Sequence, residues 1–212
     1  MPRDPATHAE IMGRLTHYAG PPAIQEIEEI AHMLREPSNR TAIERLAAFD
    51  AAIGGFGIHI LLERERAQQS PYEIKDRPIY RSIQYVWMHL ARHTDIEWHT
   101  RYVSEMACAH IESLVKRFAD RHNLLKRLRA SPLGSLLHQR GVRNALPQLL
   151  WEDLCWLNSA VYVHVKHNYS MRYLREPDEV AEERKGHLFS VEEAIAIYVI
   201  ARYLAVGITE AT

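Results

Sequence analysis

The residues best suited to acid–base chemistry lie close together in the stretch NSAVYVHVKHNYSM, Asn158 to Met171. Lys166 and His167 are neighbours at the end of an apolar run, and His187 follows after a charged excursion of the chain. A lysine can hold a phosphate oxygen, and two histidines can act as general acid and base near neutral pH. This group predicts acid–base chemistry on a phosphate ester, with His167 and His187 as the proton-transferring pair and Lys166 beside the phosphate.

The same residues also fit a purely structural interpretation. Cationic side chains stabilise the C-terminal end of a helix because they face the negative end of its dipole. Lys166 and His167 would then simply end a helix, and His187 would be ordinary sequence before the start of the next one. The sequence leaves both interpretations open.

Helical spacing extends the candidate site. Asn158, Tyr162 and Lys166 recur every four residues, which would place all three on one face of a helix. Tyr198 and Arg202 have the same spacing in the last apolar segment. Antiparallel packing of these two helices would bring the His167 end of the first near His187, and Arg202 is a further candidate for holding a phosphate.

The segment RFADRH offers a second arginine–histidine pair, Arg117 and His122. An arginine at this spacing could hold a scissile phosphate while the histidine moves a proton to or from a ribose hydroxyl. The pattern is short and the chain contains 13 His. About four matches are expected by chance, so the pattern is weak evidence by itself.

A metal site is the third candidate. On one continuous helix His89, His93 and Glu97 would share a face and could bind zinc or iron, with His99 close by. A helix start at Thr94 would separate them and leave the two histidines at a helix C-terminus. We therefore expect neither a metal nor another cofactor.

His110 lies on the apolar stripe of the segment EMACAHIESLVKRF. A histidine in that position usually belongs to the core and bonds a backbone carbonyl. The alternative is an inward-facing catalytic base whose pKa is shifted by burial.

Composition restricts the kinds of protein this chain can be. Its 212 residues suffice for a sizeable core, and the hydrophobic (47%) and charged (25%) fractions are ordinary for a globular protein. The net charge of -1 gives no overall attraction to polyanions, although the basic residues are mainly arginine, which suits phosphate. Cys108 and Cys155 lie in apolar segments without metal-binding spacing and are expected to be free buried thiols. With a charged N-terminus and no apolar run long enough for a bilayer, we expect a cytoplasmic protein without membrane contact.

Helix start signals dominate the chain. Ser/Thr-x-x-Glu capping boxes occur at Thr7 with Glu10, Thr41 with Glu44, Thr94 with Glu97, and Ser190 with Glu193. Pro22 would open another helix, and the glycines at 54, 55 and 57 would interrupt or closely pack a long one. Apolar spacing predicts further helices over 79–93, 95–122, near 124–130, over 146–166, and over 191–206, with brief helical turns between 131 and 147.

The turn-rich segment 70–78 is the best linker. It predicts an N-terminal helical region of residues 1–70 and a C-terminal helical bundle of residues 71–212, with the first region packed on the second or separate. One conflict concerns residues 160–167. Val161, Val163 and Val165 alternate with polar residues as in a strand, but no turn precedes them, so a helix is favoured.

Three segments resemble the prokaryotic HEPN-like all-α domains over residues 95–208: ACAHIESLVKRF, LNSAVYVHVKHNY and GHLFSVEEAIAIYVIARYLAVGI. The resemblance implies a helical bundle with a four- or five-helix core, carrying here an N-terminal helical extension. Such domains often dimerise, and they occur in toxin–antitoxin, phage-defence and RNA-processing proteins. Many of them cleave RNA without a metal, with the arginine and histidine meeting across a dimer.

The leading hypothesis is therefore an HEPN-like protein that contacts RNA or nucleotide and cleaves RNA by metal-independent acid–base chemistry. In it His167 and His187 transfer protons, and Lys166, Arg202 or Arg117 holds the phosphate, with His122 as the partner of Arg117. Two alternatives remain. The chain could be a non-catalytic interaction module, as a homodimer or as the protein partner of a toxin or antitoxin, or it could be a histidine-rich metal-binding protein.

Overall fold

The structure is a computed structural model that describes residues 3–70, 77–91, 95–124, 131–166 and 188–211. Within these ranges the chain is all-α, with helices joined by short turns and no strand. The predicted fold class is confirmed at this level. The helix expected near 124–130 lies outside the described residues, as do His167 and His187.

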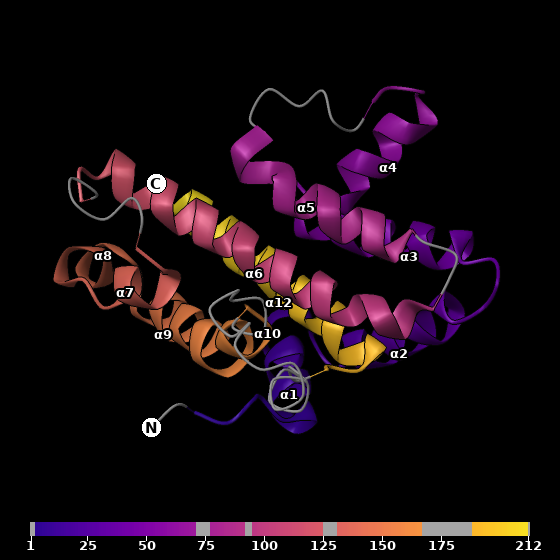
Figure 1. The fold of residues 1–212 in the computed structure, drawn as a ribbon, viewed down its shortest axis with the longest axis horizontal. Coiled ribbons are helices and arrows are strands. Elements are labelled where there is room, and N and C mark those ends of the chain that lie inside the picture. The colour runs from indigo at the N-terminus through magenta and orange to yellow at the C-terminus, as the bar shows by residue number, and fades with distance from the viewer. Residues whose placement is uncertain (1–2, 71–76, 92–94, 125–130, 167–187, 212) are drawn as a thin grey trace, which may run out of the picture.

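The centre of the molecule is helix α12, Val191–Glu210. Its sequence is apolar on nearly all sides, and such a helix is stable in water only when other helices surround it. The longest helix of the described ranges, α6 (Ile96–Arg121), packs along it, as Figure 1 shows. The expected central position of the last helix is confirmed, and it continues past the predicted end at residue 206.

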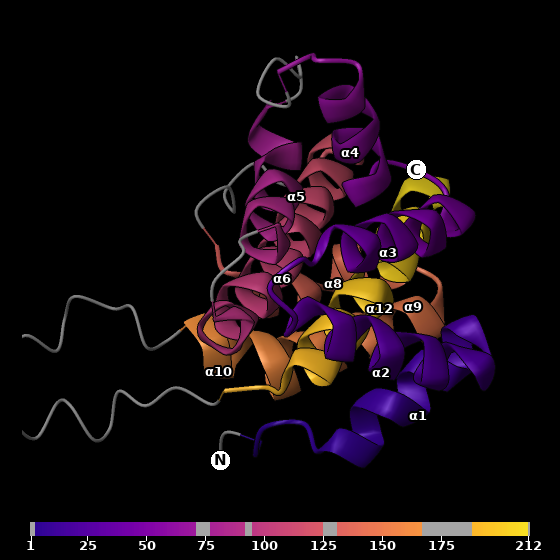
Figure 2. The same ribbon diagram turned by 90° about the vertical axis from the view of Figure 1, so that its right-hand side faces the viewer.

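The N-terminal helices cover another side of α12. They are α1 (His8–Ala19), α2 (Pro22–Leu34) and α3 (Arg40–Ile53), and each of them contacts α12 (Figure 2). In α2 the apolar stripe predicted from the sequence is buried, including Ile27 and Ile30. The amide of Ala6 also donates a hydrogen bond of 2.7 Å to the carbonyl of Ala160. Residues 3–70 thus share one apolar core with the later helices that the structure describes.

A glycine turn separates α3 from α4 (Ile58–Arg66), and α5 (Arg77–Leu90) then lies along α6. Gly54 and Gly55 adopt positive φ angles of 84° and 63°, which few other residues tolerate. A Cβ atom on Gly57 would overlap the carboxylate of Asp50. The glycines therefore interrupt a helix, one of the two roles predicted for them, and also allow a close approach to Asp50.

Two short helices, α7 (Leu133–Leu137) and α8 (Arg140–Ala145), precede a longer helical rod. The rod consists of α9 (Gln148–Trp156), a π-helical stretch η1 (Leu157–Tyr162) and α10 (Val163–Lys166). The strand-like alternation of valines is misleading here, because Val161 and Val165 are buried one helical turn apart. The helix favoured by the sequence is confirmed up to Lys166, but its π-helical stretch was not predicted.

The capping boxes at Thr7 and Ser190 are confirmed, with both reciprocal hydrogen bonds present in each. The predicted box at Thr41 is wrong, because α3 already begins after Asn39. The Asn39 side chain is buried and donates to the carbonyl of Leu90 at 3.2 Å, which holds the start of α3 against α5. Thr94 lies outside the described residues.

Among the helices of the described ranges, none has both the length and the apolar character needed to cross a bilayer.

The contribution of a helix-capping hydroxyl to stability can be measured by comparing Ser190, which caps α12, with Thr41, which lies inside α3. Ser190→Ala should lower the free energy of unfolding by about 1 kcal/mol, because alanine cannot accept the amide of Glu193 at the start of α12. The matched control is Thr41→Ala, an exposed position inside α3, which should change it by less than about 0.5 kcal/mol. Urea unfolding followed by circular dichroism measures both. Equal losses would contradict the assigned start of α3.

Candidate functional site

A groove whose walls combine apolar, polar and basic side chains lies between α7, α8 and the helical rod. It consists of two hollows of 560 Å³ and 520 Å³ that both reach His138. We call it the α7–α10 groove. Its polar lining residues are Ser135, His138, Gln139, Arg140, Arg143, Asn144, Gln148, Asn158, Tyr162 and Lys166.

Asn158, Tyr162 and Lys166, which the sequence placed on one helix face, all line the first hollow of this groove. The facing wall is the start of α7, where a Cβ atom on Gly134 would lie 2.8 Å from Asn158 Nδ2. A side chain at position 134 would therefore displace Asn158. The π-helical stretch carries two of these three residues, and π-helical turns often occur at functional sites.

Lys166 lies in a small charge cluster at the end of the rod. Its Nζ is 3.0 Å from Glu112 Oε2, and Lys116 Nζ is 2.5 Å from Glu112 Oε1. Burial raises the pKa of Glu112, but hydrogen bonds from Lys116 and Lys166 outweigh burial and hold that pKa below its usual value. One carboxylate is therefore shared by two ammonium groups, and the cluster keeps a net positive charge.

Tyr162 completes this end of the groove. The Lys166 ammonium lies 4.6 Å from the centre of the Tyr162 ring, in a cation–π contact. Burial, followed by the negative charge of Glu112, raises the pKa of Tyr162. The phenol is therefore neutral at physiological pH and acts as a hydrogen-bond donor, not as an anion.

The second hollow is lined by the arginines of α8. Arg143 stacks on Trp151 at 4.6 Å, and the Trp151 indole donates to the carbonyl of Leu137 at 2.8 Å, so the stacking ring is itself fixed. Arg140 and Arg143 are both exposed. Among the described residues no carboxylate forms an ion pair with either arginine, and none lines the two hollows. Guanidinium groups in this state suit phosphate oxygens.

The other predicted site residues lie elsewhere. Arg117 lines a small hollow of 130 Å³ together with Arg121. His122 ends α6 on the surface, with its ring 4.4 Å from that of Phe118. The structure thus does not bring Arg117 or His122 into the α7–α10 groove, and His167 and His187 are outside the described residues.

Arg202 is buried in an ion pair that the sequence did not reveal. Its Nε donates to Asp50 Oδ1 at 2.6 Å, and its Nη2 donates to the carbonyl of Gly54. Only 1% of Arg202 is exposed, and Asp50 is fully buried. The one available signal was a lone carboxylate in the apolar segment LAAFDAAIGG, which makes Asp50 an unusual core residue.

The Asp50 carboxylate is also bonded to three further groups. Tyr198 Oη donates to Oδ1 at 2.8 Å and accepts the amide of Ile58 at 3.0 Å. The backbone amide of His59 donates to Oδ2 at 3.0 Å, and His59 Nδ1 lies 2.5 Å from the same oxygen. Burial raises the pKa of Asp50, but the His59 hydrogen bond and the charge of Arg202 outweigh it, so the pKa lies below its usual value. The pair is therefore ionised in the folded protein.

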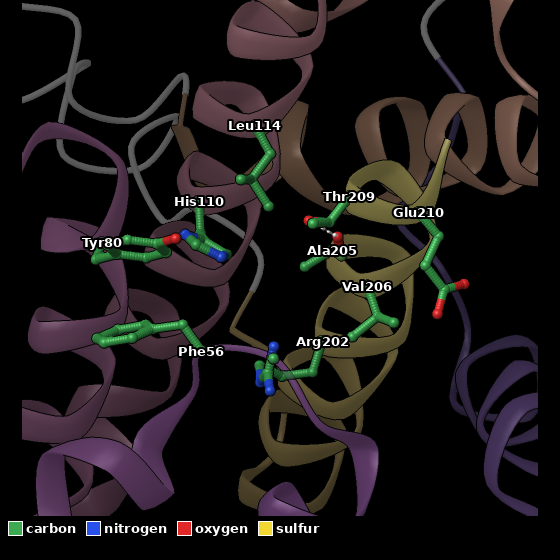
Figure 3. Close-up of a pocket in the computed structure, with 10 residues that line it drawn as sticks. Phe56, Tyr80, His110, Leu114, Arg202, Ala205, Val206, Thr209 and Glu210 are labelled. Atoms are coloured by element: carbon green, nitrogen blue, oxygen red, sulfur yellow. Dashed lines mark hydrogen bonds between the residues drawn. The ribbon is translucent and has the colours of Figure 1, made fainter. Parts of the chain in front are cut away.

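His110 is a core histidine, as one of its two interpretations predicted. It is 2% exposed, and its Nδ1 lies 3.0 Å from the carbonyl of Ile79. Because a carbonyl only accepts, Nδ1 carries the proton. Burial lowers the pKa of His110 to about 4, so the imidazole is neutral. Together with Arg202 it lines a cavity of 310 Å³ (Figure 3).

The proposed metal ligands are engaged in other contacts. His89 Nδ1 lies 2.8 Å from His99 Nδ1, and Glu97 pairs with Arg35 at 2.7 Å. Within the described ranges no group of three His, Cys, Asp or Glu side chains is arranged to hold a metal ion, and His93 falls outside those ranges.

Comparison of the chain with protein-family models, with curated proteins and with solved structures gives no match. Its function therefore has to follow from the chemistry of its own residues.

Loss of Arg202 should be costly. Arg202→Met leaves Asp50 buried without its counter-charge and should lower the free energy of unfolding by about 3–5 kcal/mol. Arg140→Met, an exposed arginine, is the control and should cost less than about 0.5 kcal/mol. The double variant Asp50→Asn, Arg202→Met should lose less than the sum of its single variants. Additive losses in urea unfolding would contradict a direct pair.

His110 should make stability depend on pH. The unfolded chain protonates this histidine near its ordinary pKa of 6.5, whereas the folded protein does so only near pH 4. The unfolded state therefore binds more protons in this window, and stability should fall by roughly 3 kcal/mol as the pH drops through it. His110→Gln should flatten this part of the profile when unfolding free energies are measured from pH 7 to 4. An unchanged slope in the variant would exclude His110 as the cause.

Proposed function

We propose that the protein is an HEPN-like RNA-contacting protein and that RNA binds in the α7–α10 groove. The observation that carries this proposal is the grouping of Lys166, Arg140 and Arg143 along hollows without a lining carboxylate. Cations release counterions from RNA when they bind its phosphates, and this release supplies most of the sequence-independent affinity. Lys166 shares the carboxylate of Glu112 with Lys116, so this end of the groove keeps a positive charge.

The neutral polar residues of the groove would add hydrogen bonds. Asn158 offers both a donor and acceptors. Such groups, with the exposed His138 where the two hollows meet, can contact ribose and base edges after the cations have positioned the backbone.

We further propose that the bound RNA is cleaved without a metal at the Lys166 end of the groove. Lys166 would hold the scissile phosphate. Of His167 and His187, one would accept the proton of the ribose 2′-hydroxyl as it attacks phosphorus, and the other would donate a proton to the departing 5′-oxygen. The products would be a 2′,3′-cyclic phosphate and a 5′-hydroxyl. The support for this step is the adjacency of His167 to Lys166 in the chain.

The binding proposal is tested with a fluorescent single-stranded RNA and the triple variant Lys166→Gln, Arg140→Gln, Arg143→Gln. Affinity should fall at least about tenfold at roughly 0.1 M salt, and the slope of log affinity against log salt should shrink by about 2, since each lost phosphate contact removes about 0.7. Fluorescence anisotropy measures both quantities.

The control for this experiment is Arg121→Gln, an exposed arginine on α6 outside the groove, which should bind as the wild type does. Equal weakening by the control and the triple variant would refute the groove as the binding site. In EDTA, the wild type should generate ends with a 2′,3′-cyclic phosphate, and His167→Ala should bind RNA without cleaving it. If the wild type at high concentration binds RNA but leaves it intact, the cleavage proposal is refuted and only the binding proposal stands.

The alternative of a non-catalytic interaction module stays a prediction. Large exposed apolar side chains are present at Trp98, Leu149 and Leu188. They belong to three different segments of the chain, and single exposed apolar residues are ordinary on protein surfaces.

A further inference from the structure

A second hollow in the molecule has a different character from the α7–α10 groove. It is a cavity of 310 Å³ between α6, α12, the start of α5 and the glycine turn before α4. Its walls are mostly apolar, with Phe56, Tyr80, Leu114, Ala205 and Val206 among them. A volume near the lower limit of small-molecule pockets is suited to a single ring system.

Arg202 supplies one polar group to this cavity. Its Nε is bonded to Asp50 and its Nη2 to the carbonyl of Gly54. These two bonds fix the guanidinium plane. Nη1 lies next to the cavity-lining Gly55, 3.8 Å from the place that a Cβ atom on this glycine would take. Figure 3 shows the head group below the space between Phe56 and Val206. Nη1 is therefore a rigid, preorganised donor.

His110 supplies the complementary group. The bond between its Nδ1 and the carbonyl of Ile79 fixes the tautomer, so Nε2 carries a lone pair and can only accept. In Figure 3 the ring projects from α6 into the same space that Arg202 faces from α12. The low pKa of about 4 keeps this acceptor neutral at physiological pH.

The charges around the cavity disfavour an anion. The positive charge of Arg202 is compensated by Asp50 directly behind it. Glu210 lies exposed at the rim and would repel a negative ligand. On the remaining side Phe56 and Tyr80 form an aromatic wall, with ring centres 4.1 Å apart.

We propose that this cavity binds an uncharged planar heteroaromatic compound with one carbonyl oxygen and one ring or amide N–H. The carbonyl accepts from Arg202 Nη1, the N–H donates to His110 Nε2, and the ring fills the apolar space beside Tyr80. This site is separate from the proposed RNA groove and does not depend on that function.

The test uses uracil and nicotinamide as probes, with toluene as the apolar control and benzoate as the anionic control. Saturation-transfer NMR and calorimetry on the full chain should show uracil or nicotinamide binding with a dissociation constant of roughly 1 mM or tighter, the range expected for so few atoms. Benzoate should bind at least about tenfold more weakly, because no net positive charge compensates it.

Variants of the cavity-lining residues test whether the ligands bind in this cavity. His110→Leu should reduce affinity for the two heterocycles at least about tenfold while toluene binds as before, since only the acceptor is lost. His110→Gln, which keeps an acceptor, should restore part of that affinity, and Val206→Phe should block all ligands by filling the cavity. Circular dichroism confirms that each variant is folded.

Several results would overturn the proposal. Absence of binding by both heterocycles at about 10 mM would do so, because that concentration exceeds the expected constant several-fold. Unchanged binding in Val206→Phe would place the ligand elsewhere. Displacement of uracil by a uridine oligonucleotide would also overturn it, since the cavity has room for a ring but not for a phosphate backbone.

Discussion

The structure depends on one interaction, the buried ion pair between Asp50 and Arg202. Two charges removed from water are stable only when their remaining hydrogen-bonding positions are also filled. Here the carbonyl of Gly54, the hydroxyl of Tyr198, and the amide and ring of His59 fill them. The glycine turn after α3 lets the chain bend closely around the carboxylate, since a Cβ atom on Gly57 would overlap Asp50.

The pair also explains how distant parts of the molecule are held in register. It fixes the end of α3 to the middle of α12, and α12 in turn contacts α6 and α9 on its other sides, as Figures 1 and 2 show. On the α9 side the helices approach closely, since a Cβ atom on Gly207 would lie 3.3 Å from Leu150 Cδ1. The helical rod that carries the α7–α10 groove is therefore positioned through the same central helix.

The sequence predicted what local spacing determines. Apolar periodicity located α2, α6 and α12, and the shared helix face of Asn158, Tyr162 and Lys166 followed from four-residue spacing alone. Contacts between residues far apart in the chain could not be predicted from local spacing. The partner of Arg202 is 152 residues away, and the start of α3 depends on a bond to Leu90. No local pattern in the sequence predicted the π-helical stretch.

A net charge of -1 is compatible with a basic groove because many arginines in the N-terminal half form ion pairs with carboxylates. Arg35 pairs with Glu97 and Glu192, and Arg45 with two glutamates of α2. Arg140 and Arg143 have no such ion pair among the described residues, and Arg143 is held by an aromatic ring instead. Salt screens exposed charges beyond about 10 Å. A bound polyanion would therefore respond to the cations it touches, whatever the sum over the whole chain.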